Sequence, residues 1–317
     1  MYTDKANAIC ILQILKEYSD EDHILQMKDI IERMNKDYQL NPDRRTVYSA
    51  IALLIDLKYD ISLYEENGKG YYLRSRNLEL SEILLIADAI YSCPFITSKQ
   101  SDDLVRKVQS ELSMYKRKQY KNITVSREER KGNNKEVFLN IEVLDEAISE
   151  KRKVSFTYLE YNTDKKLVPR RKEAYVTSPY GMVYLNEHYY LICLKDNKEE
   201  TSLYRIDRMR DIQILDEKSV AKKVDKAQIQ NTIYAYLGEP ESIKLRVDRS
   251  VLSDVIDKFG TDIIIMEDGD DVIIGFTAPP RGIKFWALQY ITNVEVLEPK
   301  WLRKEVIEAV KANRYNI

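Results

Sequence analysis

Positively charged and aromatic side chains are concentrated in residues 151–210. This stretch holds thirteen Lys or Arg against eight Asp or Glu, although the whole 317-residue chain has a formal net charge of −2. Its tyrosines are Tyr158, Tyr161, Tyr175, Tyr180, Tyr184, Tyr189, Tyr190 and Tyr204. Cations bind phosphates and aromatic rings stack on bases, so the pattern is typical of a site for a nucleic-acid-type polyanion. A Tyr-rich antiparallel sheet with a solvated basic face is the alternative, and composition does not decide between them.

The sequence offers no constellation for metal binding or acid–base catalysis. His23 and His188 are the only histidines, and Cys10, Cys93 and Cys193 are far apart and odd in number. A zinc site needs clustered Cys or His, and an enzyme needs an acid–base group placed beside its substrate. We therefore expect reduced thiols, no metal, no cofactor and no enzyme activity.

Length and hydropathy indicate a cytoplasmic protein of two or three domains. The sequence lacks an apolar run of the roughly 18–20 residues that a membrane span needs. The first residues, Met1-Tyr-Thr-Asp-Lys5, lack the basic flank and apolar stretch of a secretory signal.

Residues 1–75 predict three helices followed by a β-hairpin. Apolar residues recur at helical spacing in two stretches and in a third helix from Asp43 to about Lys58. Strands expected at residues 60–64 and 70–74 flank a turn that contains Asn67-Gly68, a strong hairpin signal. This order is that of a winged helix-turn-helix, whose last helix enters the DNA major groove by its N-terminus.

The start of this third helix carries side chains that could bind DNA. The candidates are Arg44, Arg45, Thr46, Tyr48 and Ser49, with Lys69 at the tip of the hairpin. Arg pairs with guanine or phosphate, and hydroxyl groups donate to phosphate. A small helical domain with two surface arginines is the alternative, and the acidic excess of residues 1–75 favours it. Binding by one copy is expected to be weak and salt-dependent, which predicts a homodimer on double-stranded operator DNA.

Two further segments follow this N-terminal part. Residues 76–140 predict a helical linker with a break at Cys93-Pro94 and helix starts at Ser81 and Ser101. Residues 141–216 predict one short helix and five short strands, a pattern typical of a small antiparallel barrel.

Three runs in this barrel segment resemble the signature of the WYL domain. They are Ser178-Pro-Tyr180, Tyr189-Tyr190-Leu191 and Tyr204-Arg-Ile-Asp-Arg208, with Tyr in place of the Trp that names the family. The order of modules resembles the bacterial WYL transcriptional regulators over nearly the whole chain. Ser49-Ala50 stands where relatives often carry Arg-Asp, so the base-reading pattern does not transfer.

The resemblance implies an Sm-like barrel that senses a single-stranded nucleic acid or nucleotide effector. The positions that match the family's motifs are Ser178, Tyr180, Tyr190, Arg205 and Arg208. On a regular strand Arg205 and Arg208 point to opposite faces, so only one of them lines a pocket. Asp207 offers Arg205 a structural ion pair as the alternative.

Two further arginines are candidates for effector contact. Arg170, in the run Arg170-Arg171-Lys172, is either a phosphate contact or part of a solvated edge. Arg281, at the start of a helix, could reach the ligand of a neighbouring copy, or it is a solvated helix start.

Residues 217–317 predict a charged linker (216–230), a short segment (232–237) and then a ferredoxin-like βαββαβ domain. This portion resembles the WCX extension of the same regulators, which is associated with dimerisation. Trp286 and Trp301 are expected in its core or interface.

The sequence thus predicts an α+β multidomain protein: winged helix-turn-helix, helical linker, WYL barrel and WCX-like extension. The expected function is that of a transcriptional regulator whose WYL domain binds an effector and modulates operator binding. The alternative is an accessory protein of a nucleic-acid-targeting defence system that uses the barrel to bind single strands or a protein partner. The effector, the operator and the sign of regulation are not readable.

Overall fold

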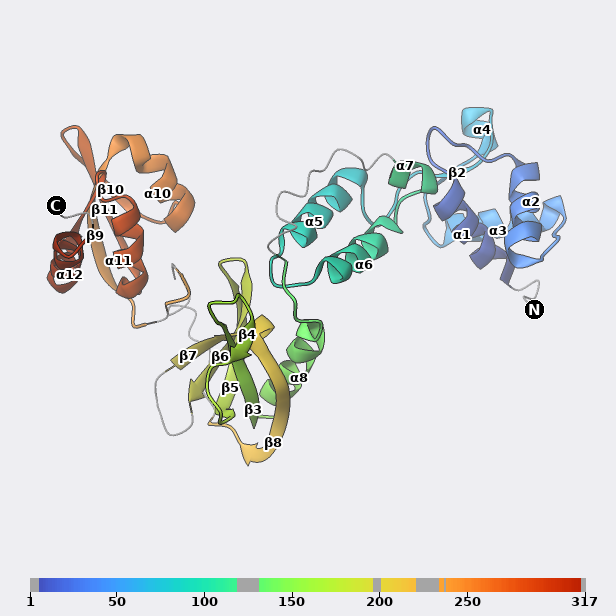
Figure 1. Ribbon diagram of the computed structural model, residues 1–317. Coiled ribbons are helices and arrows are strands. Elements are labelled where there is room, and N and C mark those ends of the chain that lie inside the picture. Colours follow the sequence, from blue (N-terminus) through green and yellow to red (C-terminus); the bar gives the residue numbers. More distant parts are fainter. Residues whose placement is uncertain (1–5, 119–130, 196–200, 221–233, 237, 315–317) are drawn as a thin grey trace. The chain divides into compact units, whose positions relative to one another are not determined.

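The computed structural model describes residues 6–118, 131–195, 201–220, 234–236 and 238–314 (Figure 1). The chain divides into two compact units, Met1–Asn133 and Asn134–Ile317, which are described separately. Residues 221–230 of the expected linker, and residues 232, 233 and 237 of the segment 232–237, lie outside the described residues. None of the described helices has the length and apolar character that a membrane crossing requires.

The first unit begins with three helices around one apolar core: α1 (Asn7–Tyr18), α2 (Met27–Tyr38) and α3 (Arg44–Asp56). Asp43 caps α3, because its carboxylate accepts a hydrogen bond from the Thr46 N–H at 2.8 Å. Val47 and Ile51 are buried against the other helices, whereas Tyr48 and Ser49 face solvent. The third predicted helix is therefore present, with its expected polar face exposed.

The region after α3 differs from the predicted hairpin. The strands are short, β1 (Ile61–Ser62) and β2 (Tyr72–Leu73), and a helix, α4 (Tyr64–Asn67), lies between them. Asn67-Gly68 does not form a two-residue hairpin turn. Gly68 adopts a left-handed conformation (φ 68°) that ends α4, and the Asn67 amide donates to the Leu63 and Gly70 carbonyls at 2.8 and 2.9 Å. These local bonds favour a helical turn over the hairpin.

Three helices complete the first unit: α5 (Leu80–Ser92), α6 (Ser98–Gln109) and α7 (Met114–Lys118). The predicted start at Ser81 lies one residue after the observed start of α5 at Leu80, whereas the predicted start at Ser101 is wrong. Glu79 precedes α5, and Thr97 caps α6 by accepting the Gln100 N–H at 3.2 Å. Ser101 lies inside the helix instead. The predicted break at Cys93-Pro94 is where α5 ends.

A dense polar contact joins α1 and the loop after it to α7 and the residues just before it. The Arg117 guanidinium binds the Glu17 carboxylate through two nitrogens, at 3.0 and 2.6 Å. The buried Asp20 carboxylate accepts hydrogen bonds from the Ser113 hydroxyl and from the backbone N–H of His23. The His23 ring lies 2.7 Å from the same carboxylate and stacks on Tyr115 at 3.6 Å.

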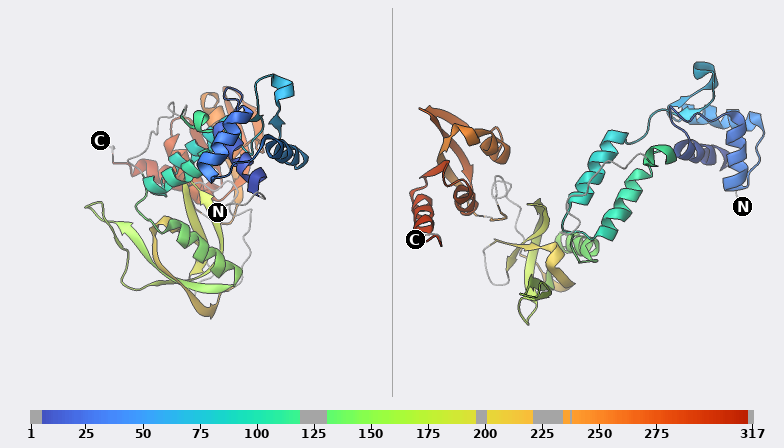
Figure 2. Two further views of the ribbon diagram at one scale, coloured as in Figure 1. Left: turned by 90° about the vertical axis from the view of Figure 1, so that its right-hand side faces the viewer. Right: turned by 45° about the horizontal axis from the view of Figure 1, so that its top comes forward.

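The second unit opens with α8 (Val137–Ser149), which lies against an antiparallel sheet (Figure 2). Its Leu144 and Ala147 belong to the apolar core shared with this sheet. The strands are β3 (Arg152–Tyr161), β4 (Leu167–Pro169), β5 (Tyr175–Leu185), β6 (His188–Lys195), β7 (Thr201–Arg205) and β8 (Met209–Lys218). Their order is β4-β3-β5-β6-β7, with β8 on β3. This sheet has six strands instead of the five predicted. β5 is a single long strand, and its pairing with β6 is irregular between Pro179 and Gly181.

The last portion is a four-stranded antiparallel sheet with helices. Its elements are β9 (Glu241–Asp248), α10 (Leu252–Phe259), β10 (Ile264–Asp268), β11 (Asp271–Ala278), α11 (Pro280–Gln289), β12 (Val294–Glu298) and α12 (Lys300–Lys311). The strand order β10-β11-β9-β12, with every neighbour antiparallel, is the order that a ferredoxin-like βαββαβ unit gives. Trp286 lies in the core of this portion, whereas Trp301 is 42% exposed.

Candidate functional site

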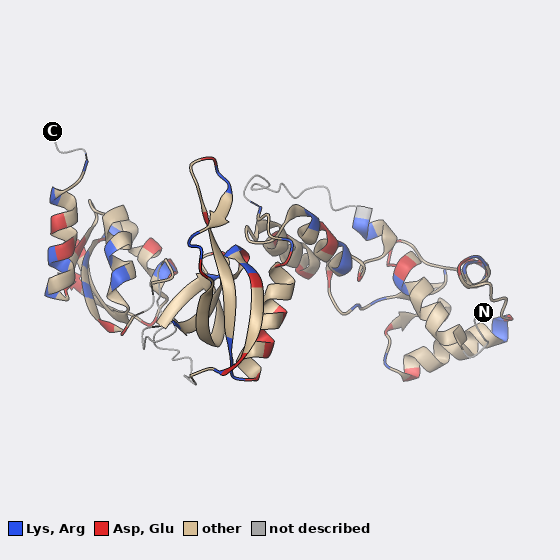
Figure 3. Ribbon diagram, turned by 60° about the horizontal axis from the view of Figure 1, so that its bottom comes forward, with Lys and Arg blue, Asp and Glu red and all other residues tan. Residues whose placement is uncertain are grey.

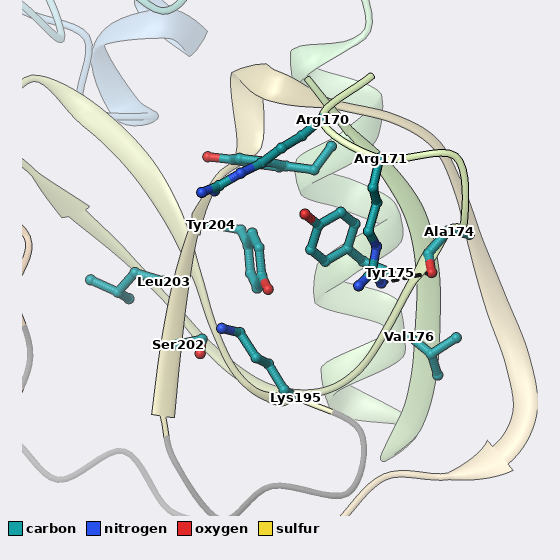
Figure 4. A pocket seen from close by; sticks show the side chains of 10 residues that line it. Arg170, Arg171, Ala174, Tyr175, Val176, Lys195, Ser202, Leu203 and Tyr204 are labelled. Carbon is teal, nitrogen blue, oxygen red and sulfur yellow. Dashed lines mark hydrogen bonds between the residues drawn. The ribbon is translucent and has the colours of Figure 1, made fainter. Parts of the chain in front are cut away.

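A pocket of 730 Å³ opens on the sheet formed by β3 to β7 (Figure 4). The residues around it come from β3, from the segment after β4, and from the facing ends of β5, β6 and β7. They are Tyr158, Arg170, Arg171, Ala174, Tyr175, Val176, Lys195, Ser202, Leu203 and Tyr204. The pocket therefore combines three cationic side chains with three tyrosine rings.

The aromatic wall of the pocket is fixed by its own packing. The Tyr175 ring stacks on Phe156 with centroids 5.6 Å apart, and Tyr204 meets both rings edge-on at 5.4 and 5.3 Å. Burial raises the pKa of Tyr158, and it raises the pKa of Tyr204 well above its usual range. Both hydroxyl groups are therefore neutral at physiological pH and can act as hydrogen-bond donors.

The cations lie at the rim of the pocket on different elements. The Arg171 guanidinium lies 3.6 Å from the centroid of the Tyr175 ring and donates to the carbonyls of Glu173 and Ala174, at 3.1 and 2.9 Å. The Lys195 side chain enters from the end of β6 toward Tyr204 (Figure 4). The charged side chains of α8 are all acidic (Figure 3), and this helix does not line the pocket.

This arrangement suits a ligand that has both an anionic group and a flat ring. Guanidinium and ammonium groups form charge-assisted hydrogen bonds with phosphate or carboxylate, and tyrosine rings stack on bases. Within the described ranges, His, Cys, Asp and Glu form no group of three that could hold a metal ion. The side chains of this pocket are suited to binding an anionic aromatic compound.

Of the effector residues predicted from sequence, Arg170 lines this pocket, with its Nε 3.4 Å from the Glu160 carboxylate. The others lie elsewhere. Ser178 is buried and its Oγ accepts the Val220 N–H at 3.1 Å. The Tyr180 hydroxyl lies 2.7 Å from Thr201 Oγ1, and Tyr190 is half-buried on β6. Arg281 is exposed in the first turn of α11.

Arg205 and Arg208 do not lie on one regular strand. β7 ends at Arg205, and Ile206–Arg208 form a 3₁₀ turn, so the alternation assumed for a strand does not apply. Arg205 donates to both Asp207 carboxylate oxygens, at 3.0 and 2.6 Å, which is the ion pair weighed as the alternative. The Arg208 guanidinium lies 5.6 Å from the Tyr161 ring centroid. Its buried Nε has no hydrogen-bond partner within the part of the chain that the structure describes.

Sequence reasoning missed most of the pocket. Arg171 was named only as part of a basic run, and Lys195, Tyr158, Tyr175 and Tyr204 were not singled out as ligand contacts. One usable signal was present: each of these residues belongs to the basic, Tyr-rich stretch 151–210. Their proximity depends on strand pairing between distant segments, such as Leu191 with Tyr204.

Five of the six residues predicted to contact DNA lie together at the start of α3. Arg44 and Arg45 are exposed there, and the Tyr48 ring contacts Tyr71 of the strand region edge-on at 6.5 Å. Arg44 also borders a 460 Å³ groove, whose basic residues on α2 are Lys28 and Lys36. Lys69 is exposed beyond the end of α4. The described geometry thus leaves cations free to approach a polyanion at one end of α3.

These features define an α+β protein whose central antiparallel sheet holds a basic pocket lined by aromatic rings. Residues 140–214 match the family model of the WYL domain, and residues 239–312 match that of the WCX domain. The chain therefore contains a WYL domain followed by a WCX domain, which confirms the resemblance for these two segments.

The solved structures that resemble the chain include two weak matches. One is proteasome accessory factor B/C (PafBC) of Arthrobacter aurescens, at 14% identity and a TM-score of 0.25, with 98% of this chain and 48% of that chain covered. The chain thus spans about half the length of that protein. The other is described as a CRISPR Cas-related protein, at 16% identity and a TM-score of 0.34, with 97% and 82% covered. A search of curated proteins gives no match.

Proposed function

We propose that this protein is a DNA-binding transcriptional regulator whose WYL domain binds a nucleic-acid-type or nucleotide effector. The observation that carries the proposal is the pocket between Tyr158, Tyr175 and Tyr204, with Arg170, Arg171 and Lys195 at its rim, inside a WYL domain. Its volume is within the range of small-ligand sites, about 300–1,000 Å³. Cations and neutral tyrosines together suit a phosphate that carries a base.

The first unit supports the DNA-binding half of the proposal. Three packed helices are followed by a short antiparallel strand pair, and the N-terminus of α3 presents Arg44 and Arg45 to solvent. In a winged helix-turn-helix this end of the third helix enters the major groove. Thr46, Tyr48, Ser49 and Lys69 then supply contacts to phosphate.

Removing one pocket cation tests the effector half of the proposal. Lys195→Gln leaves a shorter, polar side chain and removes its charge, so affinity for a short fluorescent single-stranded oligonucleotide should fall about tenfold or more. The matched control is Lys304→Gln, because Lys304 lies on α12 outside the pocket and is 78% exposed. Fluorescence anisotropy on the full chain measures both. If Lys195→Gln, Lys304→Gln and the unchanged protein bind the oligonucleotide with equal affinity, the pocket is not the binding site.

The alternative function is that of an accessory protein in a nucleic-acid-targeting defence system. One observation favours it: residues 1–75 carry thirteen acidic against ten basic residues, which is unusual for a DNA-binding domain. Replacing both Arg44 and Arg45 with Ala separates the two functions. A regulator loses duplex binding in that variant, whereas an accessory protein keeps its activity.

A further inference from the structure

The Arg171 guanidinium lies over the ring of Tyr175 at the rim of the pocket (Figure 4). Its carbon is 3.6 Å from the ring centroid, a van der Waals distance that favours parallel planes. The chain bends after Arg171, so its Nε and Nη2 donate to the carbonyls of Glu173 and Ala174, at 3.1 and 2.9 Å. Because two hydrogen bonds hold this planar group, its orientation is fixed before a ligand binds.

Both faces of the Tyr175 ring are already covered. Phe156, which is 1% exposed, stacks on the ring from the core with the two planes 8° apart. The Arg171 guanidinium covers the face that is turned toward solvent, and Arg171 itself is exposed. The surface that this three-layer stack offers to a ligand is therefore the guanidinium and not the tyrosine.

The other two tyrosines of the pocket are too buried to receive a flat ring. Tyr158 and Tyr204 are 8% and 5% exposed, and their rings contact each other edge-on at 5.0 Å. Their hydroxyl groups can still donate to a ligand. Arg170 is exposed, but its Nε lies 3.4 Å from the Glu160 carboxylate, and it lies over no ring of the described residues. By elimination, Arg171 carries the open stacking surface of the pocket.

Lys195 supplies a positive charge for a phosphate beside that surface. Its side chain enters the pocket from the end of β6 (Figure 4), and within the described ranges it forms no ion pair. The charge of Arg170, by contrast, is offset by Glu160. A phosphate at Lys195 gains a charge-assisted hydrogen bond without displacing a carboxylate.

We propose that Arg171 is the surface on which the pocket stacks one unpaired base of a nucleic-acid strand, with a neighbouring phosphate at Lys195. This inference rests on the proposed function and specifies what the pocket recognises. Bases stack on guanidinium planes as they do on aromatic rings. Stacking reads no hydrogen-bonding edge, so the site accepts different bases. A base inside a duplex is covered by its neighbours, which excludes double strands from the pocket.

Two single strands of equal length test this proposal. One is a short fluorescent oligothymidine, and the other is an abasic strand that keeps every phosphate and lacks the bases. The unchanged protein should bind oligothymidine more tightly. Arg171→Lys keeps the charge but loses the planar group, so its affinity for oligothymidine should fall about tenfold. Its affinity for the abasic strand should stay the same. Fluorescence anisotropy on the full chain measures all four affinities.

Arg33→Lys is the matched control, because the Arg33 guanidinium lies 3.7 Å from the centroid of the Tyr18 ring on the first unit, outside the pocket. This variant should bind both strands as the unchanged protein does. An equal loss for both strands in Arg171→Lys would make Arg171 a phosphate contact, and no loss for either would mean that the base stacks elsewhere. Both results overturn this inference and leave the pocket as the effector site. An unchanged protein that binds neither strand overturns the proposed effector function as well.

Discussion

Single residues in the N-terminal unit show how closely backbone segments approach one another. Gly70 precedes Tyr71, whose N–H and C=O exchange hydrogen bonds with Leu25 at 2.8 and 3.0 Å. A Cβ atom added at Gly70 would lie 2.2 Å from the Leu25 carbonyl oxygen. Because both atoms belong to backbone, neither can move aside alone. Glycine at this position is what allows the strand region after α4 to pair with the segment before α2.

Gly70→Ala is therefore expected to destabilise the N-terminal unit by about 1–3 kcal/mol, the usual cost of forcing extra atoms into packed structure. Urea denaturation of the full chain measures this effect. Gly275→Ala is the control, since its added Cβ would meet the Ile264 side chain at 3.8 Å, an ordinary contact. If the two variants unfold at the same denaturant concentration, the close approach of Gly70 to Leu25 does not limit stability.

At the scale of elements, the contact between α1 and α7 includes one buried carboxylate, Asp20. Burial alone would raise the pKa of Asp20, but hydrogen bonds from Ser113 and His23, together with the His23 charge, outweigh it. The net result is a pKa below the ordinary value of 3.8. A carboxylate whose pKa is lowered on folding stabilises the fold above its unfolded pKa. That contribution is lost as the pH falls through the folded pKa.

Asp20→Asn should consequently make the N-terminal unit less stable at pH 7 and reduce its loss of stability below about pH 4. Thermal unfolding followed by circular dichroism from pH 7 to pH 2 gives both quantities. Asp22→Asn, two residues away with an exposed side chain, should retain the profile of the unchanged protein. An Asp20→Asn profile parallel to the unchanged one at every pH would mean that Asp20 does not titrate with folding.

Elements whose apolar residues recur at regular spacing could be predicted from the sequence. The helices of residues 7–56 follow from apolar spacing, and the element order of the last portion follows from its succession of strand and helix patterns. The helix α4 could not be predicted in place of a two-residue hairpin turn, because Asn67-Gly68 is compatible with both structures. The hydrogen bonds of the Asn67 side chain favour the helical turn. The pocket was missed for a different reason. Tyr158 and Lys195 lie in different segments, and only strand register brings them to one cavity.

The motif residues show how local geometry determines the partners of a side chain. Ser178 and Arg205 were predicted as effector contacts, yet Ser178 accepts a backbone hydrogen bond from Val220 and Arg205 binds Asp207. A signature gives the position of a residue in the family, whereas the partner of its side chain depends on local geometry. The turn at Ile206–Arg208, which places Arg205 and Asp207 together, has no clear signal in the sequence.

At the scale of the whole molecule, the proposed function requires that effector binding in the pocket and DNA binding at the N-terminus of α3 are thermodynamically linked. If an oligonucleotide in the pocket changes duplex affinity by some factor, the duplex must change oligonucleotide affinity by the same factor. Couplings of this kind are typically about 5–150-fold. The duplex to use is the region upstream of the protein's own operon, with binding followed at several salt concentrations because phosphate contacts make it salt-dependent.

Lys195→Gln provides the decisive comparison for this linkage. Because Lys195 lies in the pocket and not on the first unit, the variant should bind duplex as the unchanged protein does when no oligonucleotide is present. Addition of the oligonucleotide should then shift duplex affinity in the unchanged protein and in Lys304→Gln, but not in Lys195→Gln. Anisotropy titrations with the oligonucleotide labelled, and then with the duplex labelled, measure the effect of each ligand on the affinity for the other. A full response in Lys195→Gln would show that the oligonucleotide acts by competing at the DNA-binding end, because only occupation of the pocket can depend on Lys195.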